Sequence, residues 1–477
     1  MVIIVKRKEK NMTNVRKNIS YNIIYQILII LLPLITSPYI SRVLGAESLG
    51  ICSYLHSIVS YFSFFILLGL NNYGSKTIAQ VKSDKTNLSK NFCAIFCMQL
   101  LSSVIVILIY IVYIISPLCN YKIYSLIQLL YLFGSALNIN WFFFGMEKFK
   151  LTVIRNTIVK ILSVLSIFIF VKKTTDIYIY IIILSLTNLF TSVFLWGFLK
   201  KEIELCKIGF KDIKQHIKPN LILFIPIIAV SCYKIMDKIM LGNMSEINQV
   251  ALYENAEKII QVPISIVTAI GTVMLPKISN LLSEGKEEET KMYVNKSFDL
   301  IMMIAFPMTF GIMAVCEKFM PLYLGAEFTE TGLFTKYLAI TVIFVSFANV
   351  IRTQYLIPKN KNKIFILSLV CGAFVNLIIN ILLIPKFSGM GAIIGTIFAE
   401  FTVMIYQTLA VFKEMQIHKY IKNIVKYFIF SLIMYLIINR FDSIIENDIY
   451  CILTQVVMGI LIYSALASKE IIKYIKK

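Results

Sequence analysis

The sequence has few of the residues that carry metal, thiol or redox chemistry. Its 477 residues include three histidines, His56, His216 and His418, which lie far apart. The nine cysteines form no CxxC pair and no Cys/His cluster with zinc spacing, and several lie inside apolar runs. We therefore expect no metal site, no cofactor and no catalytic residues, and we do not expect an enzyme.

Charged residues are also scarce, at 15% of the chain against ~25% in an average soluble domain. Hydrophobic residues make up 58%, and the mean hydropathy is +0.78. With only 19 glycines and 11 prolines, the chain is neither collagen-like nor a low-complexity disordered segment. This composition excludes a series of soluble domains and predicts a polytopic membrane protein.

Apolar runs long enough to cross a bilayer recur along the whole chain. A hydrocarbon core of ~30 Å needs about 20 apolar residues per helix. Such runs predict about fourteen spans, near 20–41, 49–70, 92–116, 123–144, 151–171, 177–199, 219–241, 253–275, 297–316, 332–356, 364–385, 389–412, 423–439 and 449–467. No small-residue cleavage site follows the first run, so we expect it to be retained. Met12 is an alternative start to Met1.

Most of the basic residues lie in the loops between these spans and in the terminal segments. The 47 Lys and Arg against 26 Asp and Glu give a formal net charge of +21. If the N-terminus is cytoplasmic, most of the basic residues fall in cytoplasmic segments and both termini lie inside, as the positive-inside rule requires. The partners expected for this charge are anionic membrane lipids, and nucleic acid is excluded.

Two short motifs recur six spans apart. LGxxS occurs at Leu44–Ser48 and again at Leu241–Ser245, at the ends of the first and seventh spans. Trp141, Gly145, Lys148 and Lys150 are matched by Gln354, Pro358, Lys361 and Lys363 at identical spacing. Because six is even, both halves have the same orientation, which is the parallel-repeat plan of a transporter.

The repeat predicts an all-α polytopic membrane protein with two pseudo-symmetric six-helix lobes and two further C-terminal helices. The expected divisions are a cytoplasmic N-terminal segment (1–19), a first lobe with helices 1 to 6 (20–199), a cytoplasmic linker (200–218), a second lobe with helices 7 to 12 (219–412), and helices 13 and 14 with a basic tail (413–477). Two lobes around a central cavity suit alternating access.

Ionisable side chains at membrane depth cost ~2.5–3.5 kcal/mol each on insertion scales, so each is a functional candidate. Lys234, Asp237 and Lys238 share one face of the seventh span, where Asp237 can pair with either lysine. The other cationic candidates for substrate binding are Lys160, Lys258 and Arg352, joined by the polar face of Asn22 and Gln26 in the first span. The candidates for ion coupling are Asp237, Glu257 and Glu400.

Cations outnumber carboxylates in this set, so the predicted cavity favours an anionic cargo such as a phosphate or pyrophosphate. Simpler interpretations stay open for each residue. Lysines near span ends can extend to the headgroups, and Glu400 can form a hydrogen bond between helices.

Several blocks of the sequence, in order, resemble one family. These are PYISRVLGAESLGICSY with LGLNNYGSKTIAQVKSDK, INWFFFGMEKFKLTVIRN, and FIPIIAVSCYKIMDKIMLGNMSEINQVALYENAEKIIQVP through VMLPKIS. They resemble the Wzx-type polysaccharide repeat-unit flippases of the multidrug/oligosaccharidyl-lipid/polysaccharide exporter superfamily. The resemblance covers nearly the whole chain, and Ala46-Glu47 after LG is a local departure from it.

The resemblance implies a bacterial inner-membrane protein that moves an undecaprenyl-pyrophosphate-linked oligosaccharide to the outer leaflet, for O-antigen or capsule synthesis. It places the family's basic helix-end residue on Arg42 and its Asp-Lys pair on Asp237 and Lys238, as candidates for the pyrophosphate site. Coupling to a proton or sodium gradient is a hypothesis that rests on Asp237 and Glu400, and polysaccharide polymerase machinery is a further expected partner.

Other functions remain open from the sequence. The first alternative is a cation-coupled multidrug antiporter of the same superfamily, and the second is a flippase for a lipid-linked peptidoglycan precursor. A membrane-embedded polymerase or glycosyltransferase would need a long outer loop or an acidic metal motif, and the sequence has neither.

Overall fold

The computed structural model describes residues 2–204 and 206–475, with side chains described throughout except at 2–28, 30, 229, 232–234, 419 and 475. Within these ranges the chain forms helices and no strand. In lipid the backbone N–H and C=O groups must be hydrogen-bonded within the chain, and a helix achieves this inside each span. The predicted all-α polytopic fold is confirmed.

The helices follow one another through short connections. In the first part they are α1 (Val2–Leu67), α2 (Leu70–Val81), α3 (Lys85–Ile115), α4 (Lys122–Ile127), α5 (Leu129–Ala136), α6 (Asn140–Gly145), α7 (Phe149–Phe170), α8 (Ile177–Leu199) and α9 (Phe210–Met244). The second part contains α10 (Asn248–Ser283), α11 (Glu287–Leu324), α12 (Thr329–Leu338), α13 (Ile340–Ile351), the π-helical segment η3 (Arg352–Leu356), α14 (Asn362–Val411), α15 (His418–Ile438), α16 (Asp448–Leu466) and α17 (Ser468–Ile475).

Among the described residues, ten helices are long and apolar enough to cross a membrane. The number is eleven if α12 and the helix that follows it, which meet at 40°, make one bent span. Two of the ten, Leu31–Val81 and Asn362–Val411, are 51 and 50 residues long. Each is interrupted by a non-helical residue, Gly45 (φ 75°) and Ser388 (φ 49°), and each covers two of the predicted spans. The count of fourteen stays a prediction.

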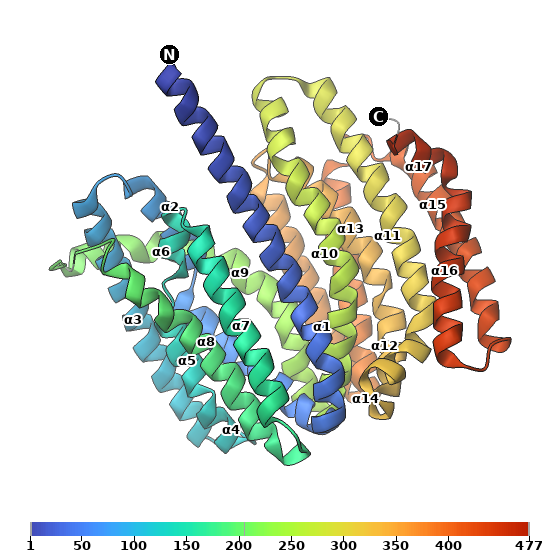
Figure 1. Ribbon diagram of the computed structural model, residues 1–477, viewed down its shortest axis with the longest axis horizontal. Coiled ribbons are helices and arrows are strands. Elements are labelled where there is room, and N and C mark those ends of the chain that lie inside the picture. The colour runs from blue at the N-terminus through green and yellow to red at the C-terminus, as the bar shows by residue number, and fades with distance from the viewer. Residues whose placement is uncertain (1, 205, 476–477) are drawn as a thin grey trace. The chain divides into compact units, whose positions relative to one another are not determined.

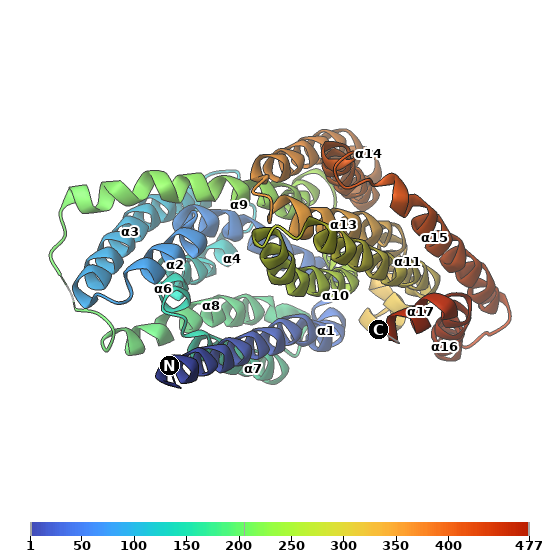
Figure 2. The same ribbon diagram turned by 90° about the horizontal axis from the view of Figure 1, so that it is seen from above.

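The chain divides into two compact units, Met1–Ser231 and Cys232–Lys477, here called the N-terminal and C-terminal units. In the N-terminal unit, α7 and α8 lie alongside α1 (Figures 1 and 2). In the C-terminal unit, α15 and α16 pack against α11, while α13 packs against α10 and α14. The division falls within α9, whereas the sequence places the junction at 200–218, so the limits of the lobes stay a prediction.

The same type of turn occurs once in each unit, at the positions where the second sequence motif recurs. Glu147 and Asn360 both have a left-handed backbone, with φ of 59° and 56°. The N–H of the next residue, Lys148 or Lys361, donates to the carbonyl five residues earlier, at 2.9 and 2.8 Å. The identical spacing seen in the sequence therefore corresponds to the same backbone geometry.

The side chains around this turn are also equivalent. Lys148 pairs with Glu202 just after α8, and Lys361 pairs with Glu414 just after α14, at 2.6 Å. Each ion pair thus connects the turn to the C-terminal end of the last helix of the corresponding predicted lobe, which is α8 in the first case and α14 in the second. One position differs between the two turns, because Trp141 in the first is replaced by Gln354 in the second.

The hairpin inside α14 depends on a close approach of backbone. A Cβ on Gly391 would lie 2.5 Å from the Leu383 carbonyl carbon and 2.6 Å from the Ile384 nitrogen, and backbone atoms cannot move aside easily. We expect Gly391→Ala to destabilise the protein by about 1–3 kcal/mol, the usual effect of overpacking. Thermal unfolding in detergent measures this. Gly311→Ala, with nothing within 4 Å of the added carbon, is the matched control. Equal unfolding temperatures for the two variants would contradict the close approach.

Candidate functional site

The carboxylate of Asp237 lies at the centre of a polar cluster inside the C-terminal unit. Its side chain is fully buried. Oδ1 accepts a hydrogen bond of 2.5 Å from Asn380 Nδ2, and the hydroxyls of Tyr253 and Thr396 each lie 2.8 Å from Oδ2. Three helices, α9, α10 and α14, therefore meet at one carboxylate, and its partners are neutral.

Oxygen atoms predominate around Asp237. The buried Asn380 also donates to Asn376 Oδ1 at 3.1 Å, and its own Oδ1 has no hydrogen-bond partner among the described residues. Gly395 allows this arrangement, since a Cβ there would lie 2.1 Å from Asn380 Oδ1. Carboxylate, amide and hydroxyl oxygens are the ligands that hard cations take in proteins. The cluster can hold a cation or a proton.

Of the two lysines that the sequence offers to Asp237, Lys238 does not pair with it, and the side chain of Lys234 lies outside the described residues. Lys238 Nζ instead pairs with Glu257 at 2.9 Å, because Asp237 is turned into the contact with α10 and α14. Lys258 pairs with Glu254 one turn earlier on its own helix, at 3.0 Å. Both lysines are thus held by carboxylates of α10 and not by Asp237.

A polar cavity of about 1010 Å³, including its open mouth, lies next to this cluster. It is lined by residues of α10, α13, η3 and α14 and by the last residue of α12, and the lining includes Glu257, Arg352, Thr396 and Glu400. Thr396 also touches Asp237, so one hydroxyl connects the cavity to the buried carboxylate. The cavity brings together Arg352, Glu257 and Glu400, three of the residues singled out from the sequence.

Two features mark the wall of the cavity near Arg352. The guanidinium carbon lies 5.6 Å from the centre of the Phe365 ring, and Arg352 begins the π-helical segment η3. π-Helical turns inside α-helices are frequent at functional sites. One turn earlier, the amide of Asn349 is buried and has no hydrogen-bond partner among the described residues. The wall of the cavity therefore presents the cation of Arg352 and the amide of Asn349, and the amide has spare hydrogen-bonding capacity.

None of the other predicted residues whose side chains are described lines this cavity. Arg42 and Lys160 belong to the N-terminal unit, where Arg42 is exposed and donates to the Pro38 carbonyl at 3.0 Å. Lys160 is half-buried on α7. Lys234, Asn22 and Gln26 lie outside the residues whose side chains are described. Their predicted roles stay predictions.

The partners of Asp237 were not visible in the sequence. Asn380 and Tyr253 are neutral residues on helices other than α9. These partners lie 143 and 16 residues from Asp237 along the chain, so no local spacing connects them. The signal that could have indicated these partners is weak, because it consists of one neutral polar residue on each of several apolar spans.

Comparison with known proteins assigns the chain to a family. The family model described as polysaccharide biosynthesis protein matches residues 15–282. Two curated relatives carry the name "Putative O-antigen transporter". The one from Shigella dysenteriae is 25% identical over 388 residues, covering 80% of this chain and 96% of the relative. The one from Escherichia coli (strain K12) is 23% identical over 392 residues, covering 80% and 93%.

Solved structures show a similar fold. The lipid II flippase MurJ in an inward closed conformation matches with a TM-score of 0.77 at 18% identity, over 96% of this chain and all of that one. An inward-facing multidrug resistance MATE family transporter of the MOP superfamily matches with a TM-score of 0.57 at 15% identity, over 82% of this chain and 99% of that one. At these identities the likeness concerns the fold alone. The matched family model covers more than half of the sequence, and the chain belongs to the polysaccharide biosynthesis protein family.

Proposed function

We propose that this protein is a flippase that moves an undecaprenyl-pyrophosphate-linked oligosaccharide repeat unit across the bacterial inner membrane by alternating access. The observation that carries the proposal is the polar cavity with Arg352 and Glu400, placed among apolar helices of a chain in this family. An arginine in a site of low dielectric binds phosphate oxygens through charge-assisted hydrogen bonds. The saccharide would use the neutral polar lining, which includes Asn349 and Gln407.

The Asp237 cluster gives this flippase a place for a coupling ion. A proton or a sodium ion bound at Asp237 would neutralise a carboxylate that is otherwise buried among neutral groups. Thr396 lies in both the cluster and the cavity, so binding at Asp237 and occupancy of the cavity share one side chain. A differential affinity of the ion for two conformations is what would couple it to transport.

Genetic complementation tests the proposed function. In a strain that lacks its own repeat-unit flippase but makes the matching lipid-linked saccharide, the wild-type chain should restore surface polysaccharide. Loss of that restoration in Lys234→Ala and Arg42→Ala would support those two site assignments, and full activity in both would remove them. Rescue of a strain depleted of its peptidoglycan-precursor flippase, or resistance to cationic dyes without any surface polysaccharide, would replace the proposed function with one of the alternatives.

The proposed orientation places both termini and the 200–218 segment in the cytoplasm. Cys206 lies in that segment and is the one exposed thiol among the cysteines whose side chains are described. A membrane-impermeant maleimide should therefore label it in inside-out vesicles and leave it unlabelled in intact cells. Cys206→Ser should lose the label and serves as the control. Labelling of Cys206 in intact cells would reverse the orientation.

A further inference from the structure

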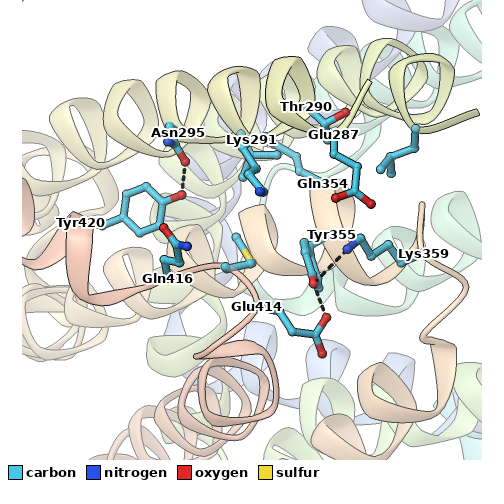
Figure 3. A pocket seen from close by; sticks show the side chains of 13 residues that line it. Glu287, Thr290, Lys291, Asn295, Gln354, Tyr355, Lys359, Glu414, Gln416 and Tyr420 are labelled. Carbon is cyan, nitrogen blue, oxygen red and sulfur yellow. Dashed lines mark hydrogen bonds between the residues drawn. The ribbon is translucent and has the colours of Figure 1, made fainter. Parts of the chain in front are cut away.

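A second pocket of the C-terminal unit, lined by polar and apolar side chains, lies where the C-terminal end of α10, the first turns of α11, the segment η3 and the α14–α15 connection meet (Figure 3). Its volume is about 620 Å³, including the open mouth. We call it the end pocket and define it by Glu287, Lys291, Asn295, Gln354, Glu414 and Gln416. The positive-inside pattern predicts that this end of the unit faces the cytoplasm.

The walls of the end pocket are fixed by contacts between elements. The hydroxyl of Tyr355 donates to Glu414, and it accepts a hydrogen bond of 3.2 Å from Lys359 Nζ (Figure 3). Glu414 is also held by Lys361 at 2.6 and 2.7 Å, and its pKa lies below the ordinary glutamate value because of that lysine first and Tyr355 second. On the opposite side, the Tyr420 hydroxyl donates to Asn295. The site is therefore preformed.

Unusual backbone conformations occur on two sides of this pocket. Gln354 belongs to the π-helical segment, which brings its side chain to the base of the site. Gln416 at the rim has φ of 51°, a left-handed conformation that non-glycine residues adopt at a cost of about 1–3 kcal/mol. Such outliers gather at binding and catalytic sites, and here both of them face one space.

The internal repeat allows the position of Gln354 to be compared with its equivalent in the N-terminal unit, where a larger side chain fills the space. At the equivalent turn of the N-terminal unit the position is taken by Trp141, whose fully buried ring packs on Gly74 and whose Nε1 donates to Gln99 at 3.0 Å. The same turn therefore accommodates an indole that fills its surroundings completely. In the C-terminal unit the smaller Gln354 leaves the end pocket open above it.

The spare hydrogen-bonding capacity of the end pocket lies in acceptors. Gln354 is fully buried, its Nε2 donates to Ser297 at 2.5 Å, and its Oε1 has no partner among the described residues. The cations of the lining already have partners, since Lys291 pairs with Glu288 at 2.8 Å and Lys359 donates to Tyr355. Glu287 reaches from α11 into the same space (Figure 3). Free acceptors beside satisfied cations suit a ligand with many hydroxyl donors better than a doubly charged phosphate.

We infer that the end pocket binds a saccharide through its ring hydroxyls, with Gln354 Oε1 accepting one of them at the base and Glu287 another at the rim. The inference rests on the proposed function, and it assigns the pocket to a sugar of the lipid-linked repeat unit on the side where that unit is assembled. The phosphate-binding cavity at Arg352 and the sugar-binding end pocket would then share the segment η3.

Site-specific photocrosslinking in the membrane tests this assignment. Gln416 is replaced by a benzophenone amino acid in the full-length chain, and the polyprenyl lipids are labelled with tritium in the prenyl chain. Membranes that make the whole repeat unit should give strong capture of label, and membranes blocked at the first glycosyltransferase, which hold only undecaprenyl phosphate, should give background. The matched control carries the same photoreactive residue at position 286. Lys286 is exposed, directly precedes α11 and does not line the pocket.

Two variants sharpen the result. Gln354→Leu and Glu287→Ala should each lower capture at position 416 at least fivefold, and Glu287 is exposed, so its variant is expected to fold normally. Equal capture of undecaprenyl phosphate and of the full lipid-linked saccharide would overturn the inference in favour of a phosphate site. Absence of capture while the wild-type chain restores surface polysaccharide would overturn the inference alone. Failure of the wild-type chain to restore polysaccharide would instead count against the proposed function.

Discussion

Asp237→Asn is expected to reduce flipping at least tenfold and to remove its dependence on the ion gradient. The amide keeps the size of the buried side chain and can still bond Thr396 and Tyr253, but it can carry neither a proton nor the charge that holds a cation. A tenfold loss of rate corresponds to about 1.4 kcal/mol in the barrier. The measurement is the rate of outward transfer of lipid-linked saccharide in vesicles, with and without an ionophore.

The controls for this result come from the same helices. Glu254→Gln removes a carboxylate of α10 that is held by Lys258 outside the buried cluster, and it should transport at close to the wild-type rate. Glu400→Gln tests the second candidate for coupling, in the wall of the cavity. Wild-type flipping in both Asp237→Asn and Glu400→Gln, unchanged by the ionophore, would end the coupling hypothesis.

Arg352→Ala should weaken substrate binding by a comparable amount. A hydrogen bond to a charged group contributes about 1.5–3 kcal/mol, which is ~10- to 150-fold in affinity. Arg352→Lys keeps the charge but loses the planar fork, so it should recover part of the activity. The apparent affinity for the lipid-linked saccharide in reconstituted vesicles measures the effect.

The matched control for Arg352 is a nearby cation outside the cavity. Lys363 is exposed at the start of α14 and does not line the cavity, so Lys363→Ala should leave the affinity unchanged. If Lys363→Ala and Arg352→Ala lowered affinity equally, the effect would be one of overall basic charge. The cavity would then lose its role in binding the pyrophosphate.

The helical spans were predictable because the physics that makes them is local. A run of apolar residues without charge forms a helix in lipid whatever its neighbours are, and most of the predicted spans coincide with helices, although 123–144 and 332–356 are each divided among three helical segments. The equivalence of the turns at Lys148 and Lys361 was also predictable from the sequence. A turn is local in the chain, and the four residues of each motif have the same spacing.

The functional site was predictable only in part. Asp237, Arg352 and Glu400 stand out because a charge inside an apolar span needs an explanation. Their partners were not visible, because Tyr253, Asn380 and Thr396 are neutral and lie on other helices. That Lys238 pairs with Glu257 and not with Asp237 was not visible for the same reason. Neighbours on one helix face were known from spacing, whereas the direction in which α10 and α14 approach was not.

The end pocket could not be predicted at all from the sequence. Its base is Gln354, which attracted attention only as the counterpart of Trp141 in the repeat. The π-helical turn η3 and the left-handed Gln416 both border the pocket, and neither conformation has a signature in these residue types. Comparison of the two equivalent turns is what shows the position to be open in one unit and filled in the other.

The most direct test of the account is transfer of the lipid-linked saccharide by the purified protein. Vesicles containing the wild-type chain and the labelled lipid are treated with periodate, which does not cross the membrane and oxidises only the sugars on the outer face. With the protein and an ion gradient, nearly all of the saccharide should become accessible over time, and with Asp237→Asn the half that starts on the inner face should become accessible at least tenfold more slowly. Equal accessibility in vesicles with wild-type protein, with the variant and without protein would contradict a flippase.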